Sequence, residues 1–397
     1  MIPLELSFLE PLGRVIARPW ADVATGMQVD SRRIEEGDLF VAVGGGEDFV
    51  AHAFARGASA ALVPADAVAA LGAIAGEIRS RSSARIVSVT GSTGKTSTKD
   101  ILYALCAPHR RTIANEANYN TEIGVPLTLC RIEEDTEVCI TELAMRGLGQ
   151  IEWLASFTRP DILVITNIGP VHLELVDTVE NVARAKAEAL PLLPAGGVAI
   201  VPADEPLLEP YLTRQDVLIT RVDPTAPLPF ETAYTAAHQL LNTRFAWAAA
   251  QSLGVPPPPG VLQVEFSKLR EEELPLPGGG LLLNDCYNAN PMSMRAALLH
   301  LSQRASDGRR VAVLGEMAEL GEGAPAYHAE VGELLRELGI EHVIGVGDLA
   351  RAYGGETVPT AGAAAARLRE VLQPGDTVLV KGSRSVGLEV VAENVYA

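Results

Sequence analysis

The stretch ARIVSVTGSTGKTSTKDILYALC, residues 84–106, decides the fold of this protein. Residues 86–89 are short, apolar apart from one serine and rich in β-branched side chains, which is typical of a buried parallel strand. A glycine turn follows, and a helical pattern runs from Lys95 to Cys106. Because a strand, a glycine turn and a helix start aim backbone N–H groups at one point, the stretch predicts an anion site.

The residues of this loop suit the phosphates of a nucleotide. Lys95 is expected to reach the β- and γ-phosphates, and the hydroxyl of Thr96 is expected to bind Mg²⁺. The glycines are separated by two residues, whereas the usual pattern has four, so a glycine turn before an ordinary helix is the alternative. The motif alone leaves kinase, ligase and motor open. The other predicted phosphate-binding residues are Gly91, Ser92, Thr93, Gly94 and Ser97.

Composition limits the classes of function. The chain has 397 residues and a net charge of −18, which argues against a general nucleic-acid binder and against a basic membrane surface. Glutamates interrupt the first ten residues and no apolar run reaches about 18 residues, so neither a signal peptide nor a membrane helix is expected. The cysteines lack paired spacing and predict buried thiols of a reducing, cytoplasmic compartment. They are Cys106, Cys130, Cys139 and Cys286.

The pattern of strands and helices predicts three α/β domains. Residues 1–82 read as a small α/β unit with strands at 38–43 and 58–63. Residues 83–260 alternate strands and helices, as a doubly wound parallel sheet does. The run GVPPPPG at 254–260 marks the second boundary, because proline has no N–H to donate. Residues 261–397 then predict a smaller, Rossmann-like domain.

Polar residues at predicted strand ends are candidates for chemistry. Glu142 ends the strand VCITE, at the edge where parallel sheets bind ligands, and could complete a Mg²⁺ site beside Thr96. A strand-end acid in solvent is an equal alternative. His172 and Lys186 carry little weight alone, since a structural histidine and a solvated lysine are commoner. Ser31 and Arg32 suit a diphosphate or uracil edge, or else a capped turn.

The third domain has two such segments, NDCYNANP at 284–291 and KGSRS at 381–385. Asp285 and Asn288 in the first suit either a turn or the edge of a ribose or base. Lys381 and Arg384 in the second could meet a substrate carboxylate.

Together these segments resemble the Mur ligases of bacterial cell-wall synthesis, over nearly the whole chain. The short glycine spacing is the family's own. Within the family, the resemblance is to the branch that joins D-alanyl-D-alanine to UDP-N-acetylmuramoyl-tripeptide. The segments that carry it include DSRRIEEGDLFVAV (30–43), NYNTEIGVPLTL (118–129), TNIGPVHLE (166–174), ARAKAEAL (183–190), HQLLNTRFAWAAA (238–250), NDCYNANP, VLGEMAELGE (313–322) and VLVKGSRS (378–385).

The resemblance implies ATP and two Mg²⁺ as cofactors. Lys95 and Thr96 then hold the phosphates and the first Mg²⁺, with Glu142 as a further ligand. His172 is implied as a ligand of the second Mg²⁺, and Lys186 as a lysine carried as a carbamate. An anionic carbamate suits two cations better than an ammonium does.

The resemblance also implies how the rest of ATP is held. Asn242 and, less closely matched, Gln239 correspond to the adenine-side asparagines, and Asp285 corresponds to the ribose contact, with Asn288 beside it. Arg270 falls where the family has an arginine that faces the γ-phosphate.

For the UDP-linked substrate, the resemblance implies Ser31 and Arg32 at the uridine end, with Asn120 and Thr121 further along. The sequence departs from the family at Thr121, where many relatives have asparagine, and at FVAHAF, where only His52 of an Asp-Gly-His run remains. Lys381 and Arg384 are expected at the substrate as well. A monomer is implied, with no nucleic-acid partner and no membrane insertion.

The implied reaction activates a carboxylate as an acyl phosphate, which the amine of the dipeptide then attacks. Lys95, Arg270 and Mg²⁺ would neutralise the charge. Two related ligases remain alternatives, one that adds a diamino acid and a folylpolyglutamate synthetase. A module that binds ATP without catalysis is a more remote one.

Overall fold

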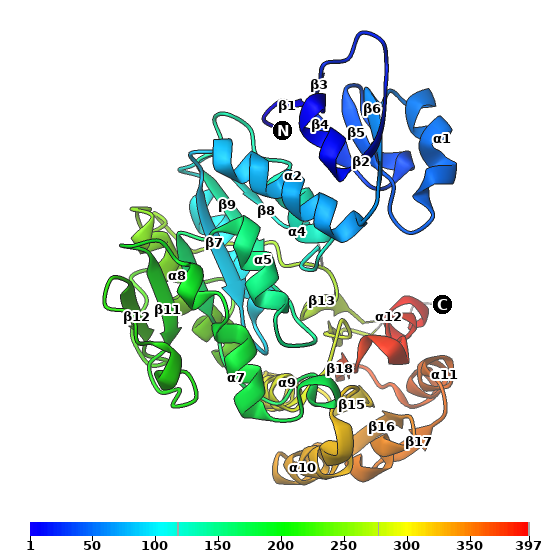
Figure 1. Cartoon of the computed structure of the whole chain (residues 1–397). Coiled ribbons are helices and arrows are strands. Elements are labelled where there is room, and N and C mark those ends of the chain that lie inside the picture. Colours follow the sequence, from blue (N-terminus) through cyan, green and yellow to red (C-terminus); the bar gives the residue numbers. More distant parts are fainter. Residues whose placement is uncertain (117–118, 277, 396–397) are drawn as a thin grey trace.

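The computed structural model describes residues 1–116, 119–276 and 278–395. Three α/β units follow one another, from the N-terminal unit at the top of Figure 1 to the C-terminal unit at its lower right. This arrangement confirms the predicted fold class. The limits of the domains stay a prediction.

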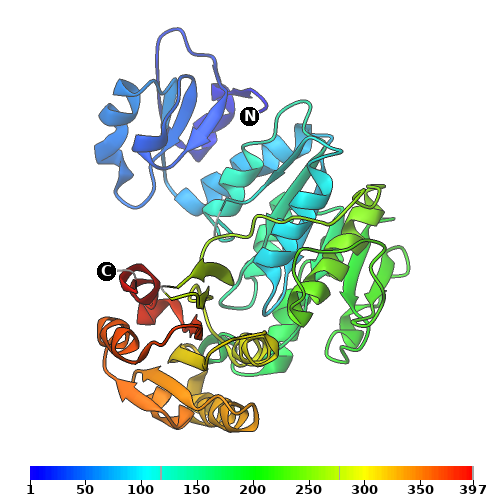
Figure 2. The ribbon, with the colours of Figure 1, turned by 180° about the vertical axis from the view of Figure 1, so that it is seen from behind.

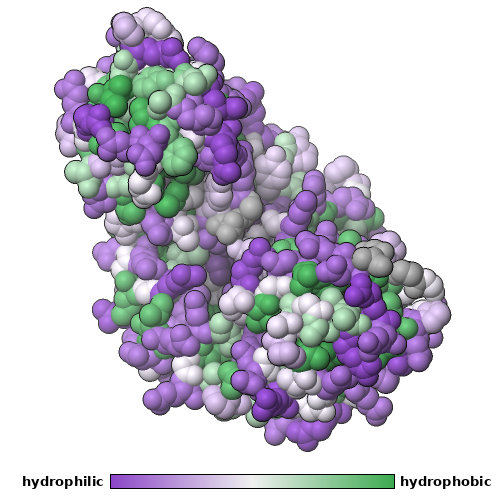
Figure 3. Space-filling model, turned by 90° about the vertical axis from the view of Figure 1, so that its right-hand side faces the viewer, coloured by the Kyte–Doolittle hydropathy of each residue, from purple (hydrophilic) through white to green (hydrophobic). Residues whose placement is uncertain are grey.

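The N-terminal unit is a four-stranded sheet in the order β2-β6-β5-β4, in which only β2 runs antiparallel to its neighbour. Phe40 and Ala61 on one face pack against α1, and Leu39 and Leu62 on the other face join the core that continues into the central unit. In Figure 3 this unit stands out as a lobe above the larger body. The bounds are β1 Leu4–Glu5, β2 Gly13–Ala17, β3 Val23–Ala24, β4 Gly26–Gln28, β5 Asp38–Val41, α1 Val50–Ala55 and β6 Ala60–Pro64.

The central unit is a sheet of six parallel strands in the order β12-β11-β10-β7-β9-β8. The chain winds from β7 to one side through β8 and β9, and to the other through β10 to β12. The loops that follow β7 and β10 therefore meet at the switch point, where open parallel sheets bind ligands. The bounds are β7 Arg85–Thr90, β8 Thr112–Ala114, β9 Val138–Glu142, β10 Ile162–Ile165, β11 Val198–Pro202 and β12 Leu218–Val222.

Helices cover both faces of this sheet, because alternate strand residues are apolar on both sides. Ile86 and Leu163 face α2, α4, α5 and α7, whereas Val87 and Val164 face α3 and α8. The bounds are α2 Ala67–Arg81, α3 Lys95–Cys106, α4 Gly124–Leu129, α5 Gln150–Thr158, α6 Leu173–Val176, α7 Val179–Ala187 and α8 Ala237–Ser252.

Two connecting segments pack mainly on the central unit. Helix α2, which falls within the predicted first domain, contacts α4 and α5. The segment after the proline run crosses the central unit in Figure 2. Val255 in the proline run and Leu262 and Phe266 after it pack into the core beneath α3 and α8, and Ser267 N donates to Asp100 Oδ2 at 2.9 Å. The chain therefore leaves the central unit at about Ser267.

The C-terminal unit has six strands in the order β13-β14-β18-β15-β16-β17, with β13 antiparallel at one edge. Helices α9 and α10 cover one face, and α11 and α12 cover the other. The bounds are β13 Glu272–Pro275, β14 Leu281–Asn284, α9 Pro291–Gln303, β15 Arg310–Gly315, α10 Ala324–Glu337, β16 His342–Val346, β17 Glu356–Val358, α11 Ala361–Val371, β18 Thr377–Lys381 and α12 Glu389–Asn394.

The buried apolar residues form the cores of the three units. The four cysteines are free and buried, as their apolar surroundings in the sequence predict. In the part of the chain that the structure describes, no helix combines the length and hydropathy needed to cross a membrane.

Candidate active site

The glycine loop after β7 has a backbone that requires glycine at two positions. Gly91 has φ 145°, and a Cβ there would lie 1.9 Å from Thr166 Oγ1. Gly94 has φ 75°, and a Cβ there would lie 2.3 Å from Asn242 Oδ1. Since only glycine adopts such angles without strain and leaves this space, the loop can turn tightly into α3. Helix α3 then begins at Lys95 with its N-terminus facing the loop.

The loop is fastened to the segment that follows β10. Asn167 Oδ1 accepts from Thr93 N at 2.8 Å, and Asn167 Nδ2 donates to Thr93 Oγ1 at 2.7 Å. Ser92 Oγ donates to the carbonyl of Gly169 at 3.0 Å. Asn167 was not singled out from the sequence, although its place directly after a buried strand is the signal that could have found it. These bonds fix the conformation of the loop relative to the end of β10.

Lys95 folds back over the loop, and its Nζ donates to the Gly91 carbonyl at 2.8 Å. Burial lowers the pKa of Lys95; Glu142 opposes the shift and Arg270 adds to it. The charges of Glu142 and Arg270 are therefore close enough to affect Lys95. The sequence predicts all three residues for a phosphate site.

Glu142 ends β9 and is 1% exposed. Its Oε1 accepts from Asn120 Nδ2 at 2.8 Å, and its Oε2 is buried without a hydrogen-bond partner among the described residues. A buried carboxylate oxygen without a partner is costly unless it meets a cation or a donor. Mg²⁺ takes few protein ligands beside phosphate oxygens and water. The donor set of Glu142 and the buried Thr96 therefore fits Mg²⁺, although the described residues hold no group of three or more metal-binding side chains.

His172 lies on the loop before α6 with φ 54°, an unusual backbone for a residue with a side chain. Its Nδ1 is hydrogen-bonded to Glu319 Oε2 of the C-terminal unit. Glu319 also has a positive φ, 62°. Burial lowers the pKa of His172, and Glu319 opposes that shift. Glu319 is a residue that sequence reasoning missed, although it lies in the quoted stretch VLGEMAELGE.

Lys186 lies on α7 and is 2% exposed. Burial lowers the pKa of Lys186 well below its ordinary range, and the charge of Lys95 adds to the shift. In the described ranges no ion pair or hydrogen bond of its Nζ is recorded, so a solvated surface lysine is the wrong interpretation of this residue. The amine of Lys186 is therefore buried, and its charged form is disfavoured.

The loop opens into a cavity of about 240 Å³ between the central and C-terminal units. Helix α8 contributes Gln239 and Asn242, both buried, and the link before β13 contributes Arg270. The guanidinium of Arg270 lies 4.1 Å from the centroid of the Tyr287 ring. Two further lining residues, His238 and Glu271, were not predicted from the sequence.

The C-terminal unit contributes a buried ion pair to the same cavity. Lys381 Nζ lies 2.5 Å from Asp285 Oδ2 and donates to the Asn288 carbonyl at 3.1 Å. Lys381 is therefore already paired within the protein. Arg384, on the next loop, pairs with Glu389 at 3.5 Å and does not line the cavity.

The residues predicted for the uridine end lie in the N-terminal unit, around a separate cavity of about 700 Å³. Ser31 Oγ and His52 Nδ1 are 2.9 Å apart, and Arg32 is paired with Asp30 at 2.7 Å. Thr121 is exposed. The quoted stretch 118–129 begins at Asn118, which lies outside the described residues.

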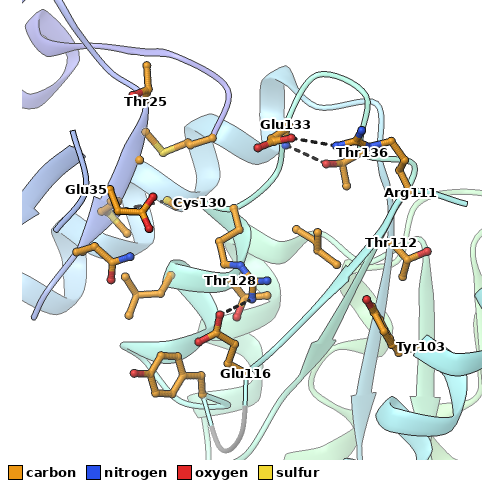
Figure 4. A pocket seen from close by; sticks show the side chains of 18 of the residues that line it. Thr25, Glu35, Tyr103, Arg111, Thr112, Glu116, Thr128, Cys130, Glu133 and Thr136 are labelled. Carbon is orange, nitrogen blue, oxygen red and sulfur yellow. Dashed lines mark hydrogen bonds and ion pairs between the residues drawn. The ribbon is translucent and has the colours of Figure 1, made fainter. Parts of the chain in front are cut away.

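A further cavity, about 870 Å³, lies between the N-terminal and central units. In Figure 4, Thr25 and Glu35 line one side of it, and Tyr103 and Thr112 line the other. None of the residues predicted for ATP lies among its lining residues.

Comparison with known proteins shows which family has these features. The family model described as "Mur ligase middle domain" matches residues 89–249, and "Mur ligase, glutamate ligase domain" matches residues 270–384. The chain is 32% identical to the UDP-N-acetylmuramoyl-tripeptide–D-alanyl-D-alanine ligase of Escherichia coli (strain K12), over 91% of this chain and 91% of that protein.

Solved structures agree with the family models. MurF from Acinetobacter baumannii superposes with a TM-score of 0.87 at 27% identity, covering 100% of this chain and 99% of that chain. The MurF ligase of Thermotoga maritima, solved in complex with ADP, gives a TM-score of 0.79 at 26% identity, over 93% of this chain and 96% of that chain. Sequence and fold agree over nearly the full length, so the chain belongs to the Mur ligase family.

Proposed function

We propose that this protein is an ATP-dependent ligase that joins D-alanyl-D-alanine to UDP-N-acetylmuramoyl-tripeptide. The observation that carries the proposal is that the glycine loop and Lys95 open into a cavity between two units that Asn242, Arg270 and Asp285 also line. The substrates of the proposal are those in the names of the relatives. The residues of the site suit such a reaction.

The glycine loop and Lys95 would hold the β- and γ-phosphates of ATP, since the loop presents N–H groups and the helix end there. Arg270, held over Tyr287, would approach the γ-phosphate from the link between the units. Gln239 and Asn242 would contact adenine. Together Lys95 and Arg270 offset the repulsion between an anionic carboxylate and the triphosphate.

Thr96 and Glu142 would hold one Mg²⁺, and His172 a second. When bound, Mg²⁺ supplies charge neutralisation at the phosphates. The buried Oε2 of Glu142, without a partner in the described chain, supports the first of these assignments. For the second, His172 presents its ring with Nδ1 already fixed by Glu319.

Lys186 would act as a carbamate. The lowered pKa favours the neutral amine, which can add to the carbon of CO₂, forming an N–C bond and releasing one proton to solvent. The product is an anion in a place where Lys95 and Mg²⁺ are the neighbours. An anionic side chain there is favoured by the same charges that disfavour the ammonium.

The reaction would then proceed in two steps. A carboxylate oxygen of the tripeptide attacks the γ-phosphorus, and the bond to ADP breaks, giving an acyl phosphate. The amine of the dipeptide attacks the acyl carbon, the carbon–oxygen bond to phosphate breaks, and the amine loses a proton. Lys95 and Arg270 position the phosphoryl group in the first step, and Ser31 and Arg32 would hold the distant UDP end in the N-terminal unit.

Phosphate release by the purified protein tests the function. The mixture contains ATP, Mg²⁺ and UDP-N-acetylmuramoyl-tripeptide, with or without D-alanyl-D-alanine. Release that needs both substrates, with the pentapeptide product found by mass, is the expected result. Release with the shorter dipeptide substrate and a diamino acid would assign the sister activity instead. No release with either pair would contradict a ligase.

A further inference from the structure

Glu271 is a buried acid that the proposed reaction does not use. It lies in the link between the central and C-terminal units, directly after Arg270, and has φ 50°. Leu269, two residues earlier, has φ 61°. Two residues with side chains in the left-handed region, so close together, are unusual and mark a backbone held in place by its surroundings.

Two histidines fix one oxygen of this carboxylate. His238 Nε2 at the start of α8 lies 2.6 Å from Glu271 Oε1, and His300 Nδ1 on α9 lies 3.5 Å from the same oxygen. Burial alone would raise the pKa of Glu271, but the neighbouring histidines outweigh it and lower the pKa. A lowered pKa favours the carboxylate, which accepts hydrogen bonds and donates none.

The second oxygen has no such partner. Glu271 Oε2 is buried and finds no hydrogen-bond partner in the described part of the chain. Its residue lines the same cavity as the glycine loop, together with Gln239 and Asn242. A buried, ionised oxygen is costly to leave unpaired, and the loss is recovered when a ligand supplies a donor.

The neighbouring acid in the cavity is already engaged. Asp285 Oδ2 lies 2.5 Å from Lys381 Nζ, which also donates to Asn288. Asp285 Oδ2 is thus paired, whereas Glu271 Oε2 is buried without a hydrogen-bond partner among the described residues. ATP carries two kinds of neutral donor on its nucleoside, the ribose hydroxyls and the adenine amino group, whereas its phosphates offer only acceptors that a carboxylate repels.

We propose that Glu271 Oε2 accepts a hydrogen bond from a neutral donor on the nucleoside of bound ATP, and so helps to determine which nucleotide the site takes. This inference rests on the proposed function, because it assumes that the cavity binds ATP. His238 and His300 are positioning residues, since they contact the other oxygen of the carboxylate and tie it to α8 and α9. A purely structural role, in which Glu271 only ties α8 to α9, is the competing explanation.

Equilibrium binding of nucleoside diphosphates separates the two. Calorimetry would measure the binding of ADP, 2′-deoxy-ADP, 3′-deoxy-ADP and inosine diphosphate, each with Mg²⁺, to the full chain. Inosine diphosphate lacks the amino group and presents a carbonyl oxygen that a carboxylate repels. We expect at least one analogue to bind about tenfold to a hundredfold more weakly than ADP, the range for a hydrogen bond to a charged group. The analogue that loses affinity identifies the donor.

The variants then connect that loss to the residue. In Glu271→Ala the difference between ADP and the discriminated analogue should shrink to less than about threefold, because the acceptor is gone. Glu271→Gln keeps the shape and should give an intermediate difference, which serves if the alanine variant does not fold. Glu273→Gln is the matched control, since Glu273 is exposed and pairs with Arg304 at 2.6 Å away from the cavity.

Two results would overturn the inference. Equal binding of all four nucleotides by the unmodified protein would show that the site reads none of these donors. A difference that survives in both Glu271 variants would assign the discrimination to another residue and leave Glu271 a structural role. If the unmodified protein bound no ADP at all, the proposed function would fail together with the inference.

Discussion

The central unit has an interface with each of its two neighbours, and the two interfaces differ in how their charged side chains are paired. Toward the N-terminal unit, the cavity of about 870 Å³ is lined by arginines that are already paired. Arg33 and Arg131 both reach Glu116, Arg110 reaches Glu137, and Arg111 reaches Glu133 and Asp135. Toward the C-terminal unit, the cavity of about 240 Å³ is lined by the buried pair Lys381–Asp285 and by Glu271, whose Oε2 has no partner among the described residues.

The difference shows that the volume of a cavity does not mark an active site. Exposed pairs such as Arg111–Glu133 contribute at most about 1 kcal/mol to stability and leave no group waiting for a ligand. Glu142 and Glu271 each have a buried carboxylate oxygen without a partner among the described residues. Such an oxygen is unfavourable until a ligand donates to it or binds it. Variants in the two interfaces should therefore behave very differently.

The largest effect is expected from Lys95→Ala. Removing this charge from the glycine loop should reduce kcat by about a hundredfold to a thousandfold, the range for loss of one group that stabilises developing charge. Phosphate release under saturating ATP measures it. The UDP-linked substrate should bind as before, because we propose that its uridine end binds to the N-terminal unit, and calorimetry with that substrate provides the control. Activity within threefold of the unmodified protein would remove Lys95 from the reaction.

Lys186→Ala should reduce turnover by about a hundredfold, because the anion at this position is lost. Short carboxylic acids such as acetate should restore part of the activity, since a free carboxylate can occupy the space of the missing carbamate. Phosphate release with increasing acetate measures the recovery.

The control for that variant lies on the same helix. Arg184→Ala removes an exposed cation from α7 and should neither lose activity nor respond to acetate. A Lys186→Ala protein with full activity, or one whose low activity acetate does not change at any concentration, would argue against the carbamate.

Glu319→Gln should have a smaller effect, about tenfold, because Glu319 acts through His172 rather than on the substrate. The amide holds the ring less firmly, so we expect a higher Mg²⁺ concentration for half-maximal activity and a weaker binding of Mn²⁺ in the presence of ADP. Phosphate release over a Mg²⁺ series and the spin-resonance signal of free Mn²⁺ measure the two.

Glu322→Gln is the matched control for Glu319, since Glu322 lies three residues further along the same loop and is exposed. A Glu319→Gln variant with lower kcat but an unchanged Mg²⁺ requirement would mean that Glu319 only helps the units to dock.

Much of the site could be predicted from the sequence because its signals are local. The glycine loop and the strand before it lie within a few residues, and Glu142 stands at the end of an apolar run. Parallel strands place such ends at one edge, so the meeting of Lys95 and Glu142 follows from the pattern. The fold class follows for the same reason.

The missed residues depend on contacts between distant segments. Glu319 meets His172 from 147 positions away, and Glu271 meets His238 and His300 from the link between two units. In the sequence Glu271 belongs to the run REEEL, which is typical of a solvated strand or loop. Its burial arises only when α8 and α9 close on it, which no local pattern encodes.

The smallest effect is expected from Arg111→Gln, which tests the other interface. Arg111 is 62% exposed in its side chain and pairs with Glu133 at 3.2 Å and with Asp135 at 2.9 Å. Solvent and salt screen such pairs, so the free energy of unfolding should change by less than about 1 kcal/mol, and kcat and KM should not change. Urea unfolding and phosphate release measure these quantities. A tenfold rise in KM for the UDP-linked substrate would instead mean that the larger cavity takes part in binding, and the contrast between the two interfaces would then lie in which substrate each one holds.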